Sequence, residues 1–267
     1  MTRQPLRLPP SPPSITTRPL ADGPVVLFMP ALDEEAAVGD CIARAPATVG
    51  GREVKVLVVD DGSTDDTAAT ARRAGAAVVS MPAPTGLGAA VRTGLAWAGE
   101  HGAAVVAFCD ADGEYPPEEL EALVAPVLDG EADYVVGSRF AGRIDRMRPH
   151  RRAGNLILTR VLAWVARRPI SDGQSGFRAL SAEAASAAEI IHDYNYAQVL
   201  TLDLLGKGFR YVEVPISYHF RTTGDSFVKL GPYLWRVIPA VAAQLRGTAR
   251  SDQGPGLKSR SILRSSS

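Results

Sequence analysis

Residues 103–114 read AAVVAFCDADGE, and this stretch decides the fold. Ala103–Cys109 is apolar at every position, which indicates a short strand buried on both faces, as in a parallel sheet covered by helices. Asp110 and Asp112 follow it directly. Two carboxylates one residue apart repel each other unless a cation lies between them. The stretch therefore predicts an α/β sheet with an acidic cluster where one strand ends.

The same alternation of strand and helix patterns extends on both sides of this stretch. Other short apolar runs are Val25–Met29, Val54–Val59, Ala76–Met81 and Tyr134–Val136. Helical patterns separate them at Glu34–Ala45, Asp65–Ala74, Leu87–Glu100 and Pro117–Leu128. This order predicts an open, mostly parallel α/β sheet with helices on both faces. Ser63, with Asp66 three residues later, is predicted to cap the second helix.

The pattern changes after about residue 140. We expect helices at Arg152–Arg168 and Tyr194–Lys207, a strand at Phe209–Phe220 and a final amphipathic helix at Leu230–Leu245. Prolines near the N-terminus and serines near the C-terminus favour a disordered arm over residues 1–23 and a disordered tail over residues 248–267. One domain over residues 24–247 is then expected to carry the function.

The composition favours a globular, intracellular protein. Of the 267 residues 46% are hydrophobic, and 29 basic side chains balance 29 acidic ones, which favours neither disorder nor nucleic-acid binding. Cys41 and Cys109 both lie in apolar runs, as expected of reduced thiols in the cytoplasm. No run of eighteen apolar residues predicts a transmembrane helix, and the N-terminus lacks the apolar stretch of a signal peptide.

Charged residues follow most of the expected strands. They occur in Asp33-Glu34, Asp60-Asp61, Asp110-Ala111-Asp112-Gly113-Glu114 and Gly137-Ser138-Arg139. Because ligands of open α/β sheets bind beyond the carboxyl ends of the strands, we expect these groups to converge on one edge. Asp60 or Asp61 could instead only shape a turn, and Glu34 could only favour a helix N-terminus.

The pair Asp110 and Asp112 is harder to explain as a turn. A hard divalent cation would bind both carboxylates together with the oxygens of a diphosphate. Such a cation would also neutralise the charge that develops on a leaving nucleotide diphosphate.

Several motifs together resemble a known enzyme family. They are residues 27–34 (LFMPALDE), 58–65 (VVDDGSTD), 86–88 (GLG), 110–112 (DAD) and 137–139 (GSR). In this order they resemble the GT-A fold of family 2 glycosyltransferases. Residues 171–178 (SDGQSGFR), 213–216 (EVPI) and 221–226 (RTTGDS) are similar to the dolichyl- or polyprenyl-phosphate mannosyl- or glucosyltransferase branch. The resemblance covers about residues 24–245.

The resemblance implies inverting, metal-dependent transfer of a hexose from GDP-mannose or UDP-glucose to a polyprenyl phosphate. Mg²⁺ or Mn²⁺ would be the cofactor, bound by Asp110 and Asp112. The implied donor-binding residues are Pro30, Leu32, Glu34, Val59, Asp61, Ala111, Glu114 and Arg221. Arg139 would address phosphates, as the forked donors of arginine suit that geometry.

Two positions depart from the family pattern. Leu32 and Asp33 stand where the family usually has tyrosine and asparagine, and Phe227 replaces its usual lysine. Donor identity and binding of the acceptor phosphate are therefore less well defined than the fold.

Asp172 is the carboxylate expected near the acceptor. It could act as a general base or orient the nucleophile. A phosphate acceptor is already anionic and needs no base. A turn residue before Gly173 is an equal alternative.

A basic stretch precedes one of the expected helices. Between Arg139 and Arg152, ends included, six arginines and His150 face the single acid Asp145. A solvated loop is the simple interpretation. The apolar run Leu156–Val165 follows, however, which favours contact with a lipid phosphate or with the cytoplasmic face of a membrane.

Three other functions are alternatives. Residues 86–91 (GLGAAV) partly match a dinucleotide fingerprint and would suit an NAD-dependent oxidoreductase, but Val91 replaces the third glycine. A non-catalytic protein that binds nucleotide sugar or lipid is the second alternative. The third keeps the donor chemistry and uses a soluble small-molecule or glycan acceptor.

Overall fold

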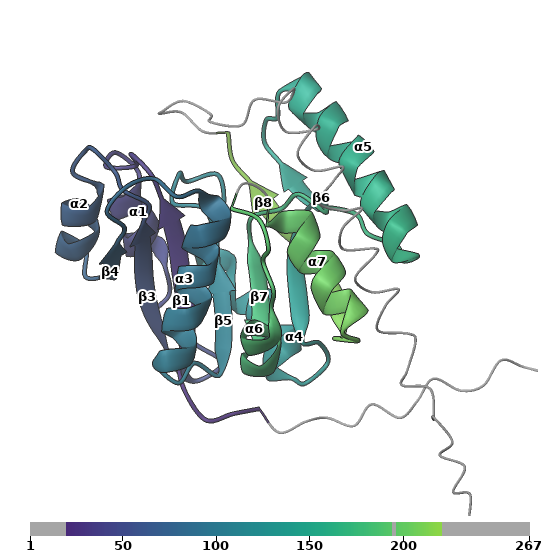
Figure 1. Cartoon of the computed structure of the whole chain (residues 1–267), viewed down its shortest axis with the longest axis horizontal. Helices are drawn as coiled ribbons and strands as arrows, with labels where there is room; N and C mark the ends of the chain where they lie inside the picture. Colours follow the sequence, from purple (N-terminus) through teal and green to yellow (C-terminus); the bar gives the residue numbers. More distant parts are fainter. Residues whose placement is uncertain (1–19, 194–195, 221–267) are drawn as a thin grey trace, which may run out of the picture.

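A computed structural model of the chain describes residues 20–193 and 196–220. An eight-stranded sheet in the order β2-β3-β1-β5-β7-β6-β8, with β4 paired to β3, runs through its centre (Figure 1). The strands are β1 (Val25–Ala31), β2 (Thr48–Val49), β3 (Arg52–Asp60), β4 (Ala77–Ser80), β5 (Val105–Phe108), β6 (Tyr134–Ile144), β7 (Arg178–Ser181) and β8 (Tyr211–Tyr218).

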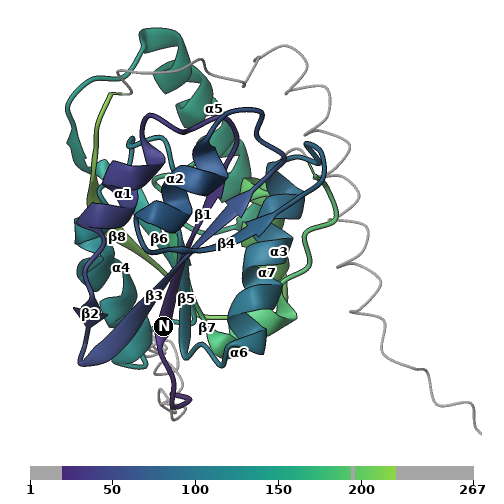
Figure 2. The same cartoon turned by 90° about the vertical axis from the view of Figure 1, so that its left-hand side faces the viewer.

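Helices cover both faces of this sheet, as predicted. They are α1 (Val38–Arg44), α2 (Thr67–Arg73), α3 (Leu87–Glu100), α4 (Leu120–Leu128) after a 3₁₀ turn at Pro117–Glu119, α5 (Pro149–Ala166), α6 (Ala182–Ala187) and α7 (Ala197–Gly206). Figure 2 shows α1, α2 and α4 on one face and α3, α6 and α7 on the other. Alternate residues of β1 supply the two cores, because successive side chains of a strand point to opposite faces. Leu27 packs into the first core and Phe28 into the second.

The strand directions bring the functional loops to one edge. β1 pairs in parallel with β3 and β5, and β7 is antiparallel to both β5 and β6. Two reversals restore the direction, so β6 runs the same way as β5. The carboxyl ends of β1, β3, β5 and β6 therefore share the edge that lies uppermost in Figure 1. The predicted open, mostly parallel sheet is confirmed.

Some details differ from the sequence-based expectations. β7 and α6 were not predicted, and β6 continues to Ile144, with an irregular pairing to β8 between Ser138 and Arg143. β4 lies at an edge, and its first and last residues are exposed rather than buried. The predicted cap of α2 by Ser63 is wrong, because Asp66 stands at the cap position and makes no side-chain cap bond.

Helix α5 lies at the outer margin of the molecule, beyond β6 and α7 (Figure 1). A small apolar cluster of Leu162, Ile170 and Leu202 holds it to α7. Among the residues that the structure describes, no helix has the length and apolarity needed to cross a membrane. The expected final helix, the tail, and all but residues 20–23 of the expected arm lie outside the described residues.

Candidate active site

The loops after β1 and β3 are joined by hydrogen bonds between carboxylates and backbone. The Asp33 N–H donates to Ser63 Oγ at 3.0 Å, and the Thr64 N–H donates back to Asp33 Oδ1 at 2.7 Å. The Glu35 N–H donates to Asp65 Oδ2 at 3.2 Å. Asp33 has a left-handed φ of 54°, which aspartate tolerates better than most residues. These bonds hold the two loops in one arrangement.

The residues expected at the nucleoside lie in or beside these loops. Pro30 pairs with Val59 across β1 and β3, and both are buried. Leu32 is partly exposed. The Glu34 N–H donates to Thr67 Oγ1 at 2.7 Å. Contact of these residues with a nucleoside stays a prediction.

Asp61 is engaged by a neighbouring loop. Its Oδ1 accepts hydrogen bonds from the N–H and hydroxyl of Thr85 at 2.8 and 2.7 Å, and its Oδ2 accepts from the Gly86 N–H at 2.8 Å. Gly86 has a φ of 106°, which favours glycine, and it directly precedes α3. Asp61 therefore ties the end of β3 to the start of α3. The expected contact with the base or ribose stays a prediction.

The carboxylates after β5 influence one another strongly. Burial raises the pKa of Asp110 to about 8, and the negative charges of Asp112, Glu114 and Glu34 add to this, while Arg139 opposes it. These groups come from the loops after β1 and β5 and from the strand β6. Glu34, the acidic loop after β5 and Arg139 thus act on one carboxyl group, whereas the expected approach of Asp60 and Asp61 to it stays a prediction.

The residues at this position suit a divalent cation. Carboxylate oxygens are the ligands that Mg²⁺ and Mn²⁺ prefer. The Glu114 N–H donates to Asp112 Oδ1 at 3.0 Å and orients that carboxylate. Within the described residues, no group of three or more histidine, cysteine, aspartate or glutamate side chains is arranged to hold a metal. A cation here would need further oxygens from a diphosphate or from water.

Ala111 and Glu114 connect this acidic loop to its surroundings. Ala111 is buried, and its carbonyl accepts a hydrogen bond from the Cys41 thiol at 3.5 Å. Glu114 is also buried and pairs with Arg151 at the start of α5 at 3.1 Å. Its carbonyl accepts from the His219 N–H at 2.9 Å. Glu114 thus joins the acidic loop to the basic stretch.

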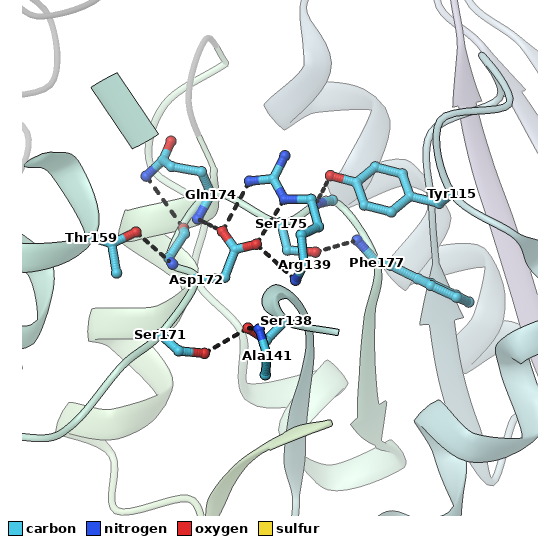
Figure 3. A network of polar contacts seen from close by, with 12 residues as sticks. Tyr115, Ser138, Arg139, Ala141, Thr159, Ser171, Asp172, Gln174, Ser175 and Phe177 are labelled. Carbon is cyan, nitrogen blue, oxygen red and sulfur yellow. Dashed lines mark hydrogen bonds and ion pairs between the residues drawn. The ribbon is translucent and has the colours of Figure 1, made fainter. Parts of the chain in front are cut away.

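Arg139 and Asp172 form a buried ion pair (Figure 3). Arg139 Nε donates to Asp172 Oδ2 at 2.7 Å and Arg139 Nη2 to Oδ1 at 2.9 Å, and the Arg139 N–H adds a third bond of 3.1 Å. The Gln174 N–H also donates to Oδ1, at 3.2 Å. Asp172 is 0% exposed and Arg139 only 5%. Both oxygens of the expected acceptor-side carboxylate therefore already accept hydrogen bonds.

The loop that carries Asp172 lies against the metal-binding candidates. The Gly176 N–H donates to the hydroxyl of Tyr115 at 2.8 Å. A Cβ on Gly176 would lie 2.7 Å from Asp110 Oδ2, so only glycine fits beside that carboxylate. On its other side, the Gly173 N–H donates to Thr159 Oγ1 of α5 at 3.0 Å.

Two residues that hold this loop were not among the predicted site residues. Arg178 is fully buried and donates to the carbonyls of Ser175 and Gly173 at 2.8 and 3.2 Å. Glu213 accepts from the backbone of Ser171 and Asp172. Both lie in motifs that carried the resemblance, and the available signal was a charged side chain between two apolar residues.

The basic stretch before α5 contacts aromatic rings. The guanidinium groups of Arg146 and Arg148 lie 5.3 and 5.9 Å from the centre of the Phe220 ring. Arg152 lies 6.0 Å from Phe140. These contacts order part of the stretch that the simple interpretation treats as a solvated loop. Arg221, an expected phosphate ligand, lies outside the described residues.

The sequence matches a known protein family. The model described as Glycosyl transferase family 2 matches residues 26–186, which is more than half of the chain. The chain belongs to glycosyltransferase family 2. Family 2 glycosyltransferases transfer a sugar from a nucleotide-activated donor, so the expected enzyme class and donor class are confirmed. Membership contradicts the oxidoreductase alternative and supports an enzyme, whereas only turnover of the donor would exclude a non-catalytic member.

Related members of family 2 include enzymes named for lipid-linked sugar transfer. The polyprenol monophosphomannose synthase of Mycolicibacterium smegmatis is 35% identical over 189 residues, covering 65% of this chain and 70% of that protein. The low-salt glycan biosynthesis hexosyltransferase Agl6 of Haloferax volcanii is 31% identical over 242 residues, or 89% of this chain. The match spans only 57% of Agl6. The resemblance to the polyprenyl-phosphate branch of family 2 is confirmed.

A solved structure shares the family 2 fold. Glucosyl-3-phosphoglycerate synthase of Mycobacterium tuberculosis, in complex with Mn²⁺, UDP-glucose and phosphoglyceric acid, has a TM-score of 0.64 and 25% sequence identity. The likeness covers 85% of this chain and 80% of that protein. The GT-A fold implied by the sequence motifs is thereby confirmed.

Proposed function

We propose that this family 2 enzyme transfers a hexose to a polyprenyl phosphate, with inversion at the anomeric carbon and with Mg²⁺ or Mn²⁺. The observation that carries the proposal is the crowding of carboxylates around Asp110, where β5 ends, with Arg139 of β6 as the opposing positive charge. Repulsion between the negative charges at this edge lowers the stability of the folded chain, which is the cost of bringing them together. A bound cation and the phosphates of a nucleotide sugar would relieve that cost.

The proposal gives each side chain a role. Asp110 and Asp112 would hold the cation, with the Asp112 carboxylate oriented by the Glu114 N–H. When bound, the cation would neutralise negative charge on the departing nucleotide diphosphate. Ala111 would present its backbone to the nucleotide from a buried, well-packed position.

Asp172 is proposed to orient Arg139 instead of acting as a general base. A base needs a free lone pair directed at the proton it removes, and both Asp172 oxygens already accept hydrogen bonds. The guanidinium of Arg139 is held in one orientation by two of those bonds. An anionic phosphate acceptor attacks without losing a proton, so the arrangement suits that class of acceptor.

The exposed face of α5 supports a lipid acceptor. Ile157, Val161 and Trp164 follow one another at helical spacing and are 59%, 49% and 80% exposed. Arg160 and Arg167 are exposed near them. An apolar stripe with a tryptophan and flanking arginines is typical of a helix that lies in the interface of an anionic membrane. We propose that α5 contacts the membrane surface from which the acceptor is taken.

A soluble acceptor that carries a phosphate group is the second candidate. The likeness to glucosyl-3-phosphoglycerate synthase, solved with phosphoglyceric acid, favours it. The roles of Asp110, Asp112 and Arg139 would be unchanged, and only the acceptor would differ.

The first experiment measures release of nucleotide diphosphate with Mn²⁺. GDP-mannose and UDP-glucose are each offered with a polyprenyl phosphate in detergent, with 3-phosphoglycerate, or with neither. Release that requires the lipid supports the proposal and identifies the donor. Release that requires 3-phosphoglycerate would instead establish the soluble acceptor. No metal-dependent release under any condition would overturn both.

A further inference from the structure

Glu213 of β8 lies behind the ion pair and accepts an unusual set of hydrogen bonds. Its carboxylate accepts the Ser171 N–H at 2.8 and 3.0 Å and the Asp172 N–H at 3.1 Å. The hydroxyl of Tyr211, two residues earlier on the same strand, donates at 2.8 Å. Two consecutive backbone N–H groups and one phenol thus converge on one carboxylate, which fixes the position of residues 171–172 relative to the sheet.

The position of those residues decides where Asp172 lies. The side chain of Asp172 is fully buried and makes its bonds to Arg139 within 2.7–3.1 Å. A shift of its backbone by about 1 Å would lengthen or misalign these bonds, since hydrogen bonds weaken steeply with angle and distance. Glu213 therefore controls the orientation of the Arg139 guanidinium without touching it.

Among the residues that the structure describes, the hydrogen-bond partners of Glu213 lie away from the acidic loop after β5. Its partners all belong to residues 171–172 and to β8 itself, whereas the carboxylates of the metal-binding candidates follow β5. A change at Glu213 should then disturb the reaction geometry and leave nucleotide binding almost intact.

We propose that Glu213 is a positioning residue for glycosyl transfer, which acts through Asp172 on Arg139. The inference rests on the proposed function, in which Arg139 addresses the phosphates at the reacting centre. It extends that function to a carboxylate in the strand behind the site.

The test compares Glu213→Ala and Glu213→Gln with a matched control. Asp133→Asn is the control, because the Asp133 carboxylate likewise accepts a backbone N–H and two side-chain N–H groups, all from Arg210, directly before β6 and β8 begin. We expect Glu213→Ala to lower kcat about 30- to 100-fold, with KM for the nucleotide sugar changed less than about threefold. Glu213→Gln keeps an oxygen acceptor and should lose only about 3- to 10-fold. Asp133→Asn should keep the wild-type kcat.

A double variant tests whether the effect passes through Asp172. If it does, adding Glu213→Ala to Asp172→Asn should lower kcat by less than about twofold further. If the fold-decrease in kcat of the double variant equals the product of the fold-decreases of the two single variants, the inference is overturned. A Glu213→Ala variant with wild-type kcat, or one no slower than Asp133→Asn, would overturn it as well.

Failure of the proposed function can be told apart from failure of this inference. If the wild-type chain uses neither the lipid nor 3-phosphoglycerate but hydrolyses the nucleotide sugar, the acceptor assignment fails. The Glu213 and Asp133 variants are then compared by their kcat for hydrolysis of the nucleotide sugar. The inference still requires a large loss for Glu213→Ala, a smaller loss for Glu213→Gln and none for Asp133→Asn.

Discussion

The two regions that are proposed to bind the donor and the acceptor, called here the donor side and the acceptor side, are held by different interactions. On the donor side, carboxylates such as Asp33 and Asp61 accept hydrogen bonds from the backbone of neighbouring loops. On the acceptor side, buried arginines provide the contacts, with Arg139 on Asp172 and Arg178 on the carbonyls around it. The donor side thus concentrates negative charge that a cation can offset, whereas the acceptor side presents a guanidinium already held in place.

Removing a carboxylate after β5 should abolish the donor chemistry. We expect Asp110→Ala or Asp112→Ala to lower the rate of nucleotide diphosphate release at least about a thousandfold, because charge on the leaving group is then left without its partner. Release is measured with saturating Mn²⁺, and circular dichroism checks the fold. Asp40→Ala, on the exposed surface of α1, is the control. Activity retained in both site variants would disprove the metal assignment.

Breaking the buried ion pair should affect stability as well as rate. Arg139→Met leaves Asp172 without its main partner, and we expect a loss of about 3–5 kcal/mol in the free energy of unfolding and about 100-fold in kcat. Urea unfolding and kinetics measure the two effects.

A double variant separates the effect on stability from the effect on rate. Arg139→Met with Asp172→Leu removes both charges and should recover most of the stability, since a buried apolar pair often replaces an ion pair without loss. It should recover none of the activity. Recovery of activity would show that the pair serves only folding.

The raised pKa of Asp110 predicts how stability depends on pH. The pKa of Asp110 is about 8 in the folded chain and ordinarily 3.8. Between pH 3.8 and pH 8, the folded protein without metal therefore keeps a proton on Asp110 that the unfolded chain has released. The free energy of unfolding should therefore fall as the pH rises from about 4 to about 8. Asp110→Asn removes this dependence. In chelator, the stability of Asp110→Asn relative to wild type should increase by on the order of 4 kcal/mol from pH 5 to pH 8.

Thermal unfolding of both proteins at the two pH values measures this difference. If the melting temperatures of wild type and variant move in parallel, the carboxylate is not destabilised by its surroundings. The Glu121→Gln variant, with an exposed carboxylate on α4, is the control and should show no such change.

The smallest effect concerns the face of α5. Trp164→Ser should weaken binding to vesicles that contain anionic lipid by about tenfold, because an interfacial tryptophan is lost. Donor hydrolysis without acceptor should not change. Ile191→Ser is the control, since Ile191 is also half exposed but lies between α6 and α7. Equal effects of the two substitutions on vesicle binding would contradict a specific role of α5.

Much of the donor side could be predicted from the sequence because its signals are local. Continuous apolar runs followed by acidic residues predicted β1, β3 and β5 and the loops after them, and α3 begins and ends where expected. The capping prediction for Ser63 failed because its hydroxyl accepts from Asp33, 30 residues away, instead of from its own helix. A capping motif takes into account only residues that are close in the sequence.

The acceptor side depends on contacts between distant segments, and less of it was predicted. β7 is four residues long and lies between β5 and β6, so it carries no periodicity strong enough to distinguish it from a loop. The pairing of Asp172 with Arg139 spans 33 residues, and that of Glu213 with Ser171 spans 42. The resemblance pointed to these motifs, but only the folded chain shows that their charges face one another.

The hydrogen bond from Gly173 to Thr159 has a consequence for engineering. It joins α5 to the loop that carries Asp172, so this helix is not an interchangeable module. In chimeras that exchange α5 for the corresponding helix of another enzyme, the graft has to carry a hydroxyl at position 159 and leave room there for the glycine. A graft chosen only for its outer surface would change the catalytic loop as well.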